Sequence, residues 1–321
     1  MLQSVTIADE GEGAGLRGSA VVTPRLRVAG VPVLDNLAAS VAVTVTVKVN
    51  METVVTETLP LTTELFSPSS KYMVLELSAI LLPDVALWFP RGYGEPNLYI
   101  VDIEYCPASS AFASLDVGCQ TLSKRIGFRT VELVQEPIEV VEEVRVKGQT
   151  ESVAFAARSQ PTTTQTQTHP SLTLMNPPPA SFYLRVNNLS VFAKGANFIP
   201  IDVFSSRVTA KDRLYVLESA AATHMNMVRV WGGGRYQETD FYERADEMGM
   251  MVWEEVMLAC ALYPRDDAFL ANVFTEVEDQ LWRLSSHPSI VVLGGNNENE
   301  VALGWFSESN NNRDLYVSDY R

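Results

Sequence analysis

Five consecutive polar side chains, Asn296-Asn297-Glu298-Asn299-Glu300, directly follow the apolar stretch SIVVLGG. A carboxylic acid such as Glu298 can donate a proton to a leaving group, and a neighbouring amide such as Asn297 can hydrogen-bond a sugar hydroxyl. A solvated loop rich in asparagine is the alternative interpretation. The cluster therefore nominates Glu298 as a general acid or base, with Asn297 beside it.

A second cluster, Arg229-Val230-Trp231-Gly232-Gly233-Gly234, ends another apolar segment. The indole of Trp231 offers a flat apolar face on which a sugar ring can pack, and the glycines allow close backbone approach. Arg229 can orient a carboxylate. The glycines could also suggest phosphate binding, but the Lys and Ser/Thr of a P-loop are absent. Farther along, Glu254 and Glu255 could face the same site or simply be solvated.

The other chemistry-bearing residue types give no metal or cofactor site, and none is expected. No Ser-His-Asp arrangement can be nominated. The histidines lack the spacing of a zinc ligand pair, and a structural role is favoured for His169, His224 and His287. The cysteines form neither a metal-ligand pattern nor a disulfide framework, so free or buried thiols are expected at Cys106, Cys119 and Cys260.

From residue 181 onward, apolar periodicity alternates between strand and helix, which indicates a parallel sheet with helices outside. A hairpin turning at Asn187-Asn188 continues into the first strand. Asp240 is expected to cap the second helix and Gly249 to end it. The further strands are expected at Met227–Trp231, Met250–Trp253 and Ile290–Leu293, and the helices at Lys211–Met225, Phe241–Met248 and Phe269–Leu284.

Polar residues just after a strand lie on the active face of a (β/α)₈ barrel, so the clusters described above should meet there. A complete barrel needs about 250 residues. Residues 181–321 accommodate four strands but not eight, so this region is predicted to be the first half of a TIM barrel.

The first 134 residues are predicted to form a small antiparallel, immunoglobulin-like β-sandwich. Apolar and polar residues alternate in Ala42–Val49, and Tyr72–Leu77 and Leu98–Ile103 are similar. Residues 135–180 differ. They begin acidic and valine-rich, become the polar run SQPTTTQTQTHPS, and are predicted to be a low-complexity linker or insertion.

Composition narrows the possible partners. The chain has 321 residues, of which 46% are hydrophobic, and a net charge of -15. This charge argues against binding to nucleic acid or to an anionic membrane surface, and it is compatible with a neutral sugar. No apolar run approaches the roughly 18 residues of a membrane span. No signal peptide is visible at the start of the sequence.

Taken together, these segments resemble the β-mannosidases of glycoside hydrolase family 2. The doubled asparagine before Glu298 is closer to the mannosidases than to the β-galactosidases and β-glucuronidases of that family. Upstream, WFPRGYGEPNLY and RIGFRTVEL resemble the end of the family's immunoglobulin-like domain. The matching motifs in the second half are FAKGANFIP, MNMVRVWGGG, FYERADEMGMMVW, ACALYP and SHPSIVVLGGNNENE.

The resemblance implies a retaining hydrolase that removes terminal β-mannose from oligosaccharides or glycoprotein glycans. It assigns Glu298 as the general acid/base, places Asn297 at the 2-hydroxyl, and places Trp231 and Arg229 in the glycone pocket. The family's nucleophile and its N-terminal sugar-binding-like domain have no counterpart in this sequence. A fragment that is inactive alone is therefore expected, and family analogy suggests a lysosomal or other vesicular location.

Departures from the family pattern keep alternatives open. Leu293-Gly294 replaces a usual Trp-Cys pair, Phe198 replaces a Trp, and Glu254-Glu255 replaces a Gln-Asp pair. One alternative is a non-catalytic chain that binds carbohydrate or a protein partner. Another is an exo-glycosidase of the β-galactosidase or exo-glucosaminidase type.

Overall fold

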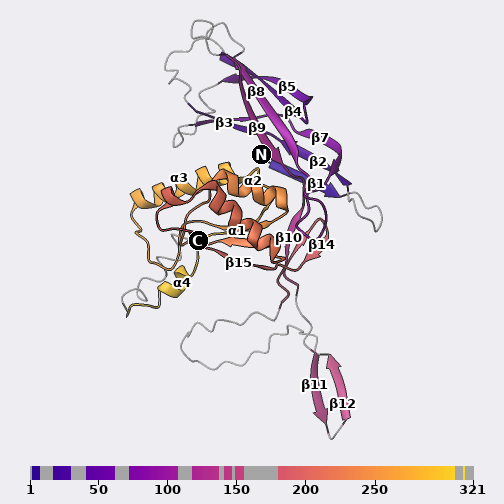
Figure 1. The fold of residues 1–321 in the computed structure, drawn as a ribbon, viewed down its shortest axis with the longest axis vertical. Helices are drawn as coiled ribbons and strands as arrows, with labels where there is room; N and C mark the ends of the chain where they lie inside the picture. The colour runs from indigo at the N-terminus through magenta and orange to yellow at the C-terminus, as the bar shows by residue number, and fades with distance from the viewer. Residues whose placement is uncertain are drawn as a thin grey trace, which may run out of the picture.

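The computed structural model describes most of the chain as a β-rich N-terminal part followed by an α/β part (Figure 1). None of the helices it describes combines the length and hydropathy that crossing a bilayer requires. The described residues are 2–7, 17–29, 41–61, 72–107, 118–136, 141–146, 149–154, 180–307 and 314.

The N-terminal part is built from antiparallel sheets with the strand orders β1-β2-β7, β3-β6 and β5-β4-β8-β9. One core joins these sheets, because alternate residues of their strands point to the same side. In β4, for example, Val43, Val45 and Val47 are all buried. The strands are β1 (Leu2–Ile7), β2 (Arg17–Thr23), β3 (Arg25–Ala29), β4 (Val41–Val49), β5 (Glu52–Leu61), β6 (Tyr72–Glu76), β7 (Ile80–Ala86), β8 (Tyr99–Pro107) and β9 (Gln120–Ile126).

A disulfide joins Cys106 to Cys119, so the expectation of free thiols at these positions is wrong. Both cysteines lie next to the last paired residues of β8 and β9, where Tyr105 is opposite Gln120. The antiparallel register therefore brings their Cα atoms to within 4.3 Å. Sequence spacing alone does not reveal this register. Cys260 is a free thiol, as expected.

Between the two parts, β10 (Val131–Val134) pairs with β13 (Tyr183–Val186), and β13 forms a hairpin with β14 (Leu189–Val191). Asn187 and Asn188 both have positive φ, which fits the predicted turn. Inside the expected linker, β11 (Val141–Val146) and β12 (Gln149–Ala154) form an antiparallel hairpin that stands apart in Figure 1. This hairpin was not foreseen, and residues 155–179 lie outside the described ones.

The α/β part contains a parallel sheet with the strand order β15-β16-β17-β18, as the alternating pattern predicts. Its apolar core lies between the sheet and the helices that connect the strands. The elements are β15 (Gly195–Phe198), the short 3₁₀ helix η3 (Ser205–Arg207), α1 (Ala210–Ala222), β16 (Met227–Val230), α2 (Thr239–Met248), β17 (Met251–Glu255), α3 (Asp267–Leu284), β18 (Ile290–Gly294) and α4 (Asn299–Ala302).

The ends of α2 confirm one expectation and correct another. Gly249 ends the helix in the left-handed conformation, with φ of 65°. A Cβ at Gly249 would also lie 2.9 Å from the carbonyl oxygen of Phe89, so glycine is required there on two counts. The N-cap is Glu238 rather than Asp240. Asp240 lies in the first turn, where its carboxylate pairs with Arg213 of α1 at 2.6 Å.

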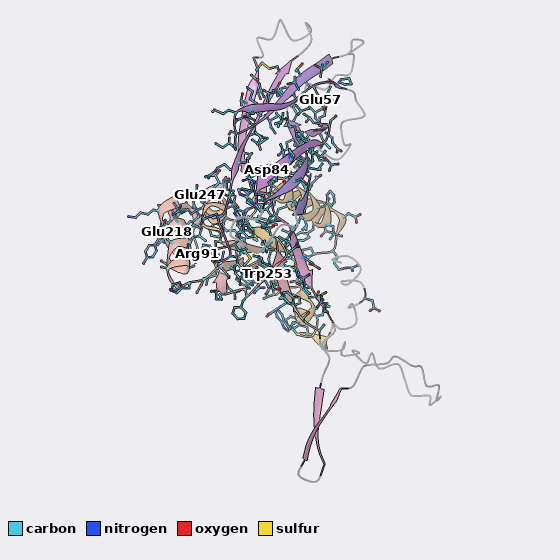
Figure 2. All side chains as sticks on the ribbon, turned by 90° about the vertical axis from the view of Figure 1, so that its right-hand side faces the viewer. Glu57, Asp84, Arg91, Glu218, Glu247 and Trp253 are labelled. Carbon is cyan, nitrogen blue, oxygen red and sulfur yellow. A yellow bond between two sulfur atoms is a disulfide. The ribbon has the colours of Figure 1, made fainter. Side chains whose placement is uncertain are left out.

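Helices α1 and α2 also pair through Arg244, which lies 3.0 Å from Glu218 and 3.0 Å from Glu247. Figure 2 shows the two glutamates on the same side of the molecule, away from Trp253 in the sheet. This arrangement keeps the charged faces of the helices turned outward and the sheet inward.

Buried polar contacts connect the two parts at the N-terminal end of the parallel strands. Trp88 is fully buried, and its indole N–H donates to the carbonyl oxygen of Asp246 at 2.8 Å. The Asp246 carboxylate accepts from His287 Nδ1 at 2.6 Å and from the backbone N–H of Ser289 at 3.0 Å. The guanidinium of Arg129 donates to backbone carbonyl oxygens just before and within β18. His287 therefore has a structural role, as the sequence favours.

Candidate active site

The opposite, C-terminal end of the parallel strands carries most of the side chains nominated from the sequence. In the sheet register, Asn197 of β15 is opposite Arg229 of β16, and Arg229 is opposite Trp253 of β17. Neighbouring residues of parallel strands point to the same face, so these three side chains share the face of the sheet remote from α2. Two residues farther along β17, Glu255 points to that face as well.

Arg229 is the hub of a hydrogen-bond network at this end. Its Nε donates to Glu255 Oε1 at 2.7 Å, and its Nη2 lies 2.5 Å from the same oxygen. The guanidinium also donates to Asn297 Oδ1 at 2.5 Å and to Asn197 Oδ1 at 3.2 Å. The Arg229 Cζ atom lies 5.1 Å from the centre of the Trp253 ring, within cation–π range. The structure thus brings together Arg229 and Asn297, which lie 68 residues apart in sequence.

The segment carrying Asn297 is anchored to the loop after β17. The Asn297 N–H donates to the Leu258 carbonyl at 2.9 Å, and the Asn297 carbonyl accepts from the Cys260 N–H at 2.7 Å. The Asn297 side chain contributes a third contact, because its Nδ2 lies 3.1 Å from Cys260 Sγ. These contacts extend the pairing of β17 and β18 beyond the strands themselves.

Glu298 is the N-cap residue of α4, four residues past the end of β18, and its side chain is exposed. Its backbone is left-handed, with φ of 59° and ψ of 21°, a conformation that costs a non-glycine residue roughly 1 kcal/mol or more. Cys260 Sγ lies 3.6 Å from Glu298 Oε2 and donates to it. The carboxyl group is therefore open to solvent beside Asn297, as a group that exchanges protons with a ligand must be.

Trp231 lies on the adjacent loop after β16 and is partly exposed. Its ring covers the backbone of Gly233, since a Cβ there would lie 2.1 Å from the indole. The Gly232-Gly233-Gly234 turn is thus explained by packing against Trp231, against Pro200 and against the loop after β17. Trp231 makes none of the contacts of the Arg229 network.

The two adjacent glutamates of β17 are both buried and neither is solvated, which settles the alternative left open by the sequence. Glu255 joins the Arg229 network, and its Oε2 also accepts from the Gly232 N–H at 2.9 Å. Glu254 points to the opposite face, where Tyr242 of α2 donates to it at 2.9 Å. Burial raises the pKa of Glu254 to about 8. Glu254 and Glu255 point to opposite faces because successive residues of a strand alternate between its two sides.

Sequence reasoning did not assign contacts to Asn197, Cys260 and Glu255. All three lie inside or just after the motifs that carry the family resemblance. Their residue types alone do not show which strand face or loop they occupy. Because residues two apart in a strand share a face, the segment Trp253-Glu254-Glu255 could have placed Glu255 on the same face as Trp253. The contact of Cys260 with Asn297 depends on loop geometry and has no sequence signal.

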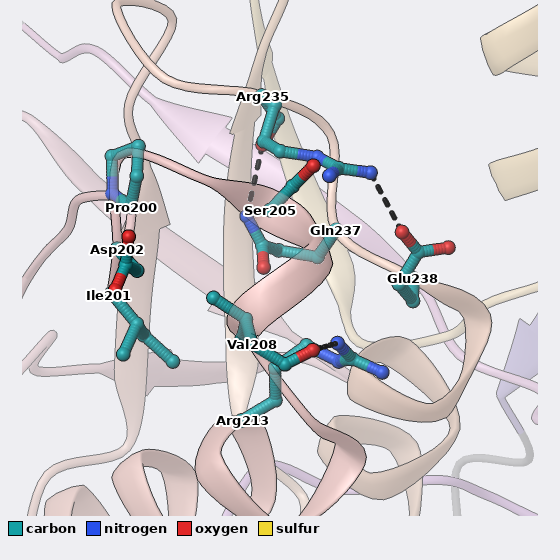
Figure 3. A pocket seen from close by; sticks show the side chains of 9 residues that line it. All are labelled: Pro200, Ile201, Asp202, Ser205, Val208, Arg213, Arg235, Gln237 and Glu238. Carbon is teal, nitrogen blue, oxygen red and sulfur yellow. Dashed lines mark hydrogen bonds and ion pairs between the residues drawn. The ribbon is translucent and has the colours of Figure 1, made fainter.

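A small pocket lies beside this site, between the loops that follow β15 and β16 (Figure 3). Its charged groups all have ion-pair partners among the described residues. Arg235 pairs with Glu238 at 2.6 Å, and Gln237 donates to the Arg235 carbonyl at 2.9 Å. Arg213, at the base, pairs with Asp240. Because these charges already have partners, the Arg229 network is the better candidate site.

Comparison with known sequences places the chain among β-mannosidases. It is 36% identical to β-mannosidase of Bos taurus over 262 residues, which cover 81% of this chain and 24% of the relative. The β-mannosidase of Mus musculus is 38% identical over 77% of this chain and 24% of its own length. The chain thus spans about a quarter of these relatives. No family model matches it.

Solved structures agree with this placement. The β-D-mannosidase of Dictyoglomus thermophilum aligns with a TM-score of 0.58 and 30% identity over 92% of this chain and 29% of that one. A β-glucuronidase of Parabacteroides merdae aligns with a TM-score of 0.55 at 15% identity, over 95% of this chain and 29% of that one, which shows a shared fold only. In the segment that it covers, this chain is therefore a homologue of the β-mannosidases of glycoside hydrolase family 2.

Proposed function

We propose that this chain carries the acid/base part of a retaining β-mannosidase active site, which acts on terminal β-D-mannose of oligosaccharides or glycoprotein glycans. One observation supports the proposal most. The exposed carboxyl of Glu298 lies next to the Asn297 amide, whose oxygen is held by Arg229 at 2.5 Å. In a homologue of β-mannosidases, this is the arrangement that a proton donor and a sugar-binding amide require.

In this proposal Glu298 first protonates the glycosidic oxygen as it leaves and then deprotonates the attacking water. Asn297 hydrogen-bonds the 2-hydroxyl, Arg229 holds Asn297, and Trp231 packs against the sugar. The site needs neither metal nor cofactor for these steps. A second carboxylate, about 5–5.5 Å from the first, would form the glycosyl-enzyme intermediate.

Neither buried glutamate of β17 suits the nucleophile role. Glu255 already accepts from Arg229 and from the Gly232 N–H, and Glu254 points to α2. We therefore infer that neither is the nucleophile and that the 321 residues alone do not turn over mannosides. The antiparallel part is interpreted as an immunoglobulin-like domain and β15–β18 as the first half of a TIM barrel. By family analogy, the location is lysosomal or otherwise vesicular.

The test is a panel of nitrophenyl glycosides and a fluoro-sugar trapping reagent, applied to the 321-residue chain and to an active β-mannosidase chain that includes it. Selective cleavage of the β-mannoside by the active chain is expected, with no turnover by the 321 residues alone. Preference for a β-galactoside or β-glucosaminide would contradict the mannosidase assignment. Turnover by the 321 residues, with label on Glu254 or Glu255, would contradict the assignment of the nucleophile.

A further inference from the structure

We propose that Glu255 is a positioning residue of this site. Through Arg229, it fixes the carboxamide of Asn297 so that an N–H, and not the amide oxygen, is presented to the sugar hydroxyl. This inference rests on the proposed function for the identity of the ligand. The positioning network itself is argued from the contacts among these side chains.

The first step concerns the orientation of the amide. A guanidinium has five N–H donors and no acceptor, so the group of Asn297 that contacts Arg229 must be its oxygen. The Nη2 to Oδ1 distance is 2.5 Å. Rotating the amide by 180° would bring its NH₂ group against the cation, donor against donor. The chemistry of the pair therefore decides an orientation that geometry alone would leave ambiguous.

The second step follows from the hydrogens that remain. Asn297 Nδ2 carries two hydrogens, and one contact, to Cys260 Sγ at 3.1 Å, uses one of them. The other hydrogen has no partner among the residues that the structure describes, and it belongs to a side chain that is partly exposed. A sugar hydroxyl at this position is thus bound as an acceptor, and its own proton remains free for a second partner.

The third step is the role of Glu255. Its side chain is 1% exposed, whereas that of Arg229 is 23% exposed. Both carboxylate oxygens are engaged, one by Arg229 and the other by the Gly232 N–H at 2.9 Å. Packing allows the side chain little movement, because a Cβ at Gly294 would lie 2.8 Å from Glu255 Cγ. The buried carboxylate therefore fixes the guanidinium in place as well as balancing its charge.

The neighbouring residue provides a matched control. Glu254 has the same side chain, lies on the same strand and is similarly buried, with 2% exposure of the residue. It accepts from Tyr242 on the opposite face of the sheet, and among the described residues it makes no contact with Arg229 or Asn297. Glu254→Gln and Glu255→Gln thus each replace a buried carboxyl group by an amide, one residue apart, but only the second should affect the network.

The experiment follows the side-chain N–H signals of Arg229 and Asn297 by ¹⁵N NMR in the folded 321-residue chain. In Glu255→Gln, both the Arg229 Nε–H and the Asn297 NH₂ signals should shift, whereas in Glu254→Gln both should stay in place. Glu255→Asp keeps the charge and should return the Asn297 signals toward their original positions. It also serves as the second variant if Glu255→Gln does not fold. The proposal would be overturned if the Asn297 chemical shifts stayed unchanged in both Glu255 variants. It would also be overturned if they changed equally in Glu254→Gln.

A ligand arm separates this inference from the proposed function. Methyl β-D-mannoside should shift the Asn297 NH₂ signals, and its 2-deoxy analogue should not. In an active chain, Glu255→Gln should lower the preference for an aryl mannoside over its 2-deoxy analogue about tenfold, the effect of one hydrogen bond of about 1.4 kcal/mol. A network that responds to Glu255→Gln but to neither sugar would contradict the mannosidase function and leave the positioning role standing.

Discussion

The parallel sheet carries a polar network at each end. The two networks differ in whether their outermost groups are paired inside the protein or open to solvent. At the N-terminal end, Asp246 accepts from His287, from Ser289 and, through its carbonyl, from Trp88. At the C-terminal end, Glu255 holds Arg229, and Arg229 holds Asn297. Both networks centre on a buried carboxylate, with Asp246 2% and Glu255 1% exposed.

The N-terminal network is closed, because both oxygens of the Asp246 carboxylate accept from groups inside the α/β part, and the Asp246 carbonyl accepts from Trp88 of the N-terminal part. Arg129 beside it is so well buried that its pKa is lowered to about 10, and it donates to backbone carbonyls of the α/β part. The C-terminal network instead ends at an amide hydrogen of Asn297 and at the exposed Glu298. A buried polar network that finishes in open donors and acceptors is suited to a ligand, whereas a closed one stabilises the fold.

The largest effect, a loss of activity, should come from substituting Glu298 at the C-terminal end of the sheet. In an active chain, Glu298→Gln should reduce hydrolysis of mannosides with poor leaving groups about 10²–10⁴-fold, because the leaving oxygen then lacks its proton donor. Activated aryl mannosides should retain much of their rate, and azide should restore more. Stability should change by less than about 0.5 kcal/mol, since the side chain is exposed.

Steady-state kinetics on the two substrate types, with urea unfolding of the same variant, checks this prediction. Equal losses on both substrate types, accompanied by an earlier unfolding midpoint, would mean that Glu298 supports the fold. The two ends of the sheet would then not differ in the way described above.

At the closed end, Asp246→Ala should cost about 3–5 kcal/mol of unfolding free energy, because it leaves His287 and the Ser289 N–H buried without a partner. Asp240→Ala, on the same helix, is the control. The Asp240–Arg213 pair is partly exposed, and its loss should cost about 1 kcal/mol. Urea unfolding of both variants measures the difference. Similar losses would show that burial does not set the strength of these pairs.

Much of this contrast could be predicted from the sequence, because strand and helix periodicity is local. The β/α alternation predicts β16, β17 and β18 to within two residues, and Gly249 marks the end of α2. Strand β17 extends two residues beyond its predicted end, to Glu255. The sequence also grouped Arg229 and Asn297 as one site, since polar residues at the C-terminal ends of parallel strands converge.

What escaped prediction depends on register and on loop geometry. The Cys106–Cys119 disulfide needs the β8–β9 register, which spacing does not show. Asp240 was expected to be a cap, but it pairs with Arg213 on another helix. The contact between Cys260 and Asn297 depends on how two loops meet. Such contacts join segments distant in sequence, where local patterns carry no information.

A smaller effect should appear with pH. Because the folded-state pKa of Glu254 is raised to about 8, the folded protein keeps a proton that the unfolded chain loses near pH 4.3. Stability should therefore fall as pH rises from about 5 to 8, with this group contributing at most about 1.4 kcal/mol of loss per pH unit. Glu254→Gln should remove that part of the slope. Urea unfolding of both proteins at pH 5, 6, 7 and 8 checks it, and parallel slopes would exclude Glu254 as the cause.

The smallest effect should come from Arg125 of β9, which joins the same two parts of the molecule at their surface. Its guanidinium pairs with Glu247 at 2.5 Å and with Glu243 at 3.7 Å, but these side chains are 35–46% exposed. Solvent screens such pairs and their ordering costs entropy, so Arg125→Ala should cost less than about 1 kcal/mol.

Salt provides the decisive comparison for this last variant. At 1 M salt the Debye length is about 3 Å, so the difference between Arg125→Ala and the original chain should nearly vanish. The loss in Asp246→Ala should persist, because its partners are buried away from the solvent ions. If Arg125→Ala instead matched Asp246→Ala in size and resisted salt, the junction would be held at its surface. The buried contacts of Trp88 and Arg129 would then no longer explain how the two parts stay together.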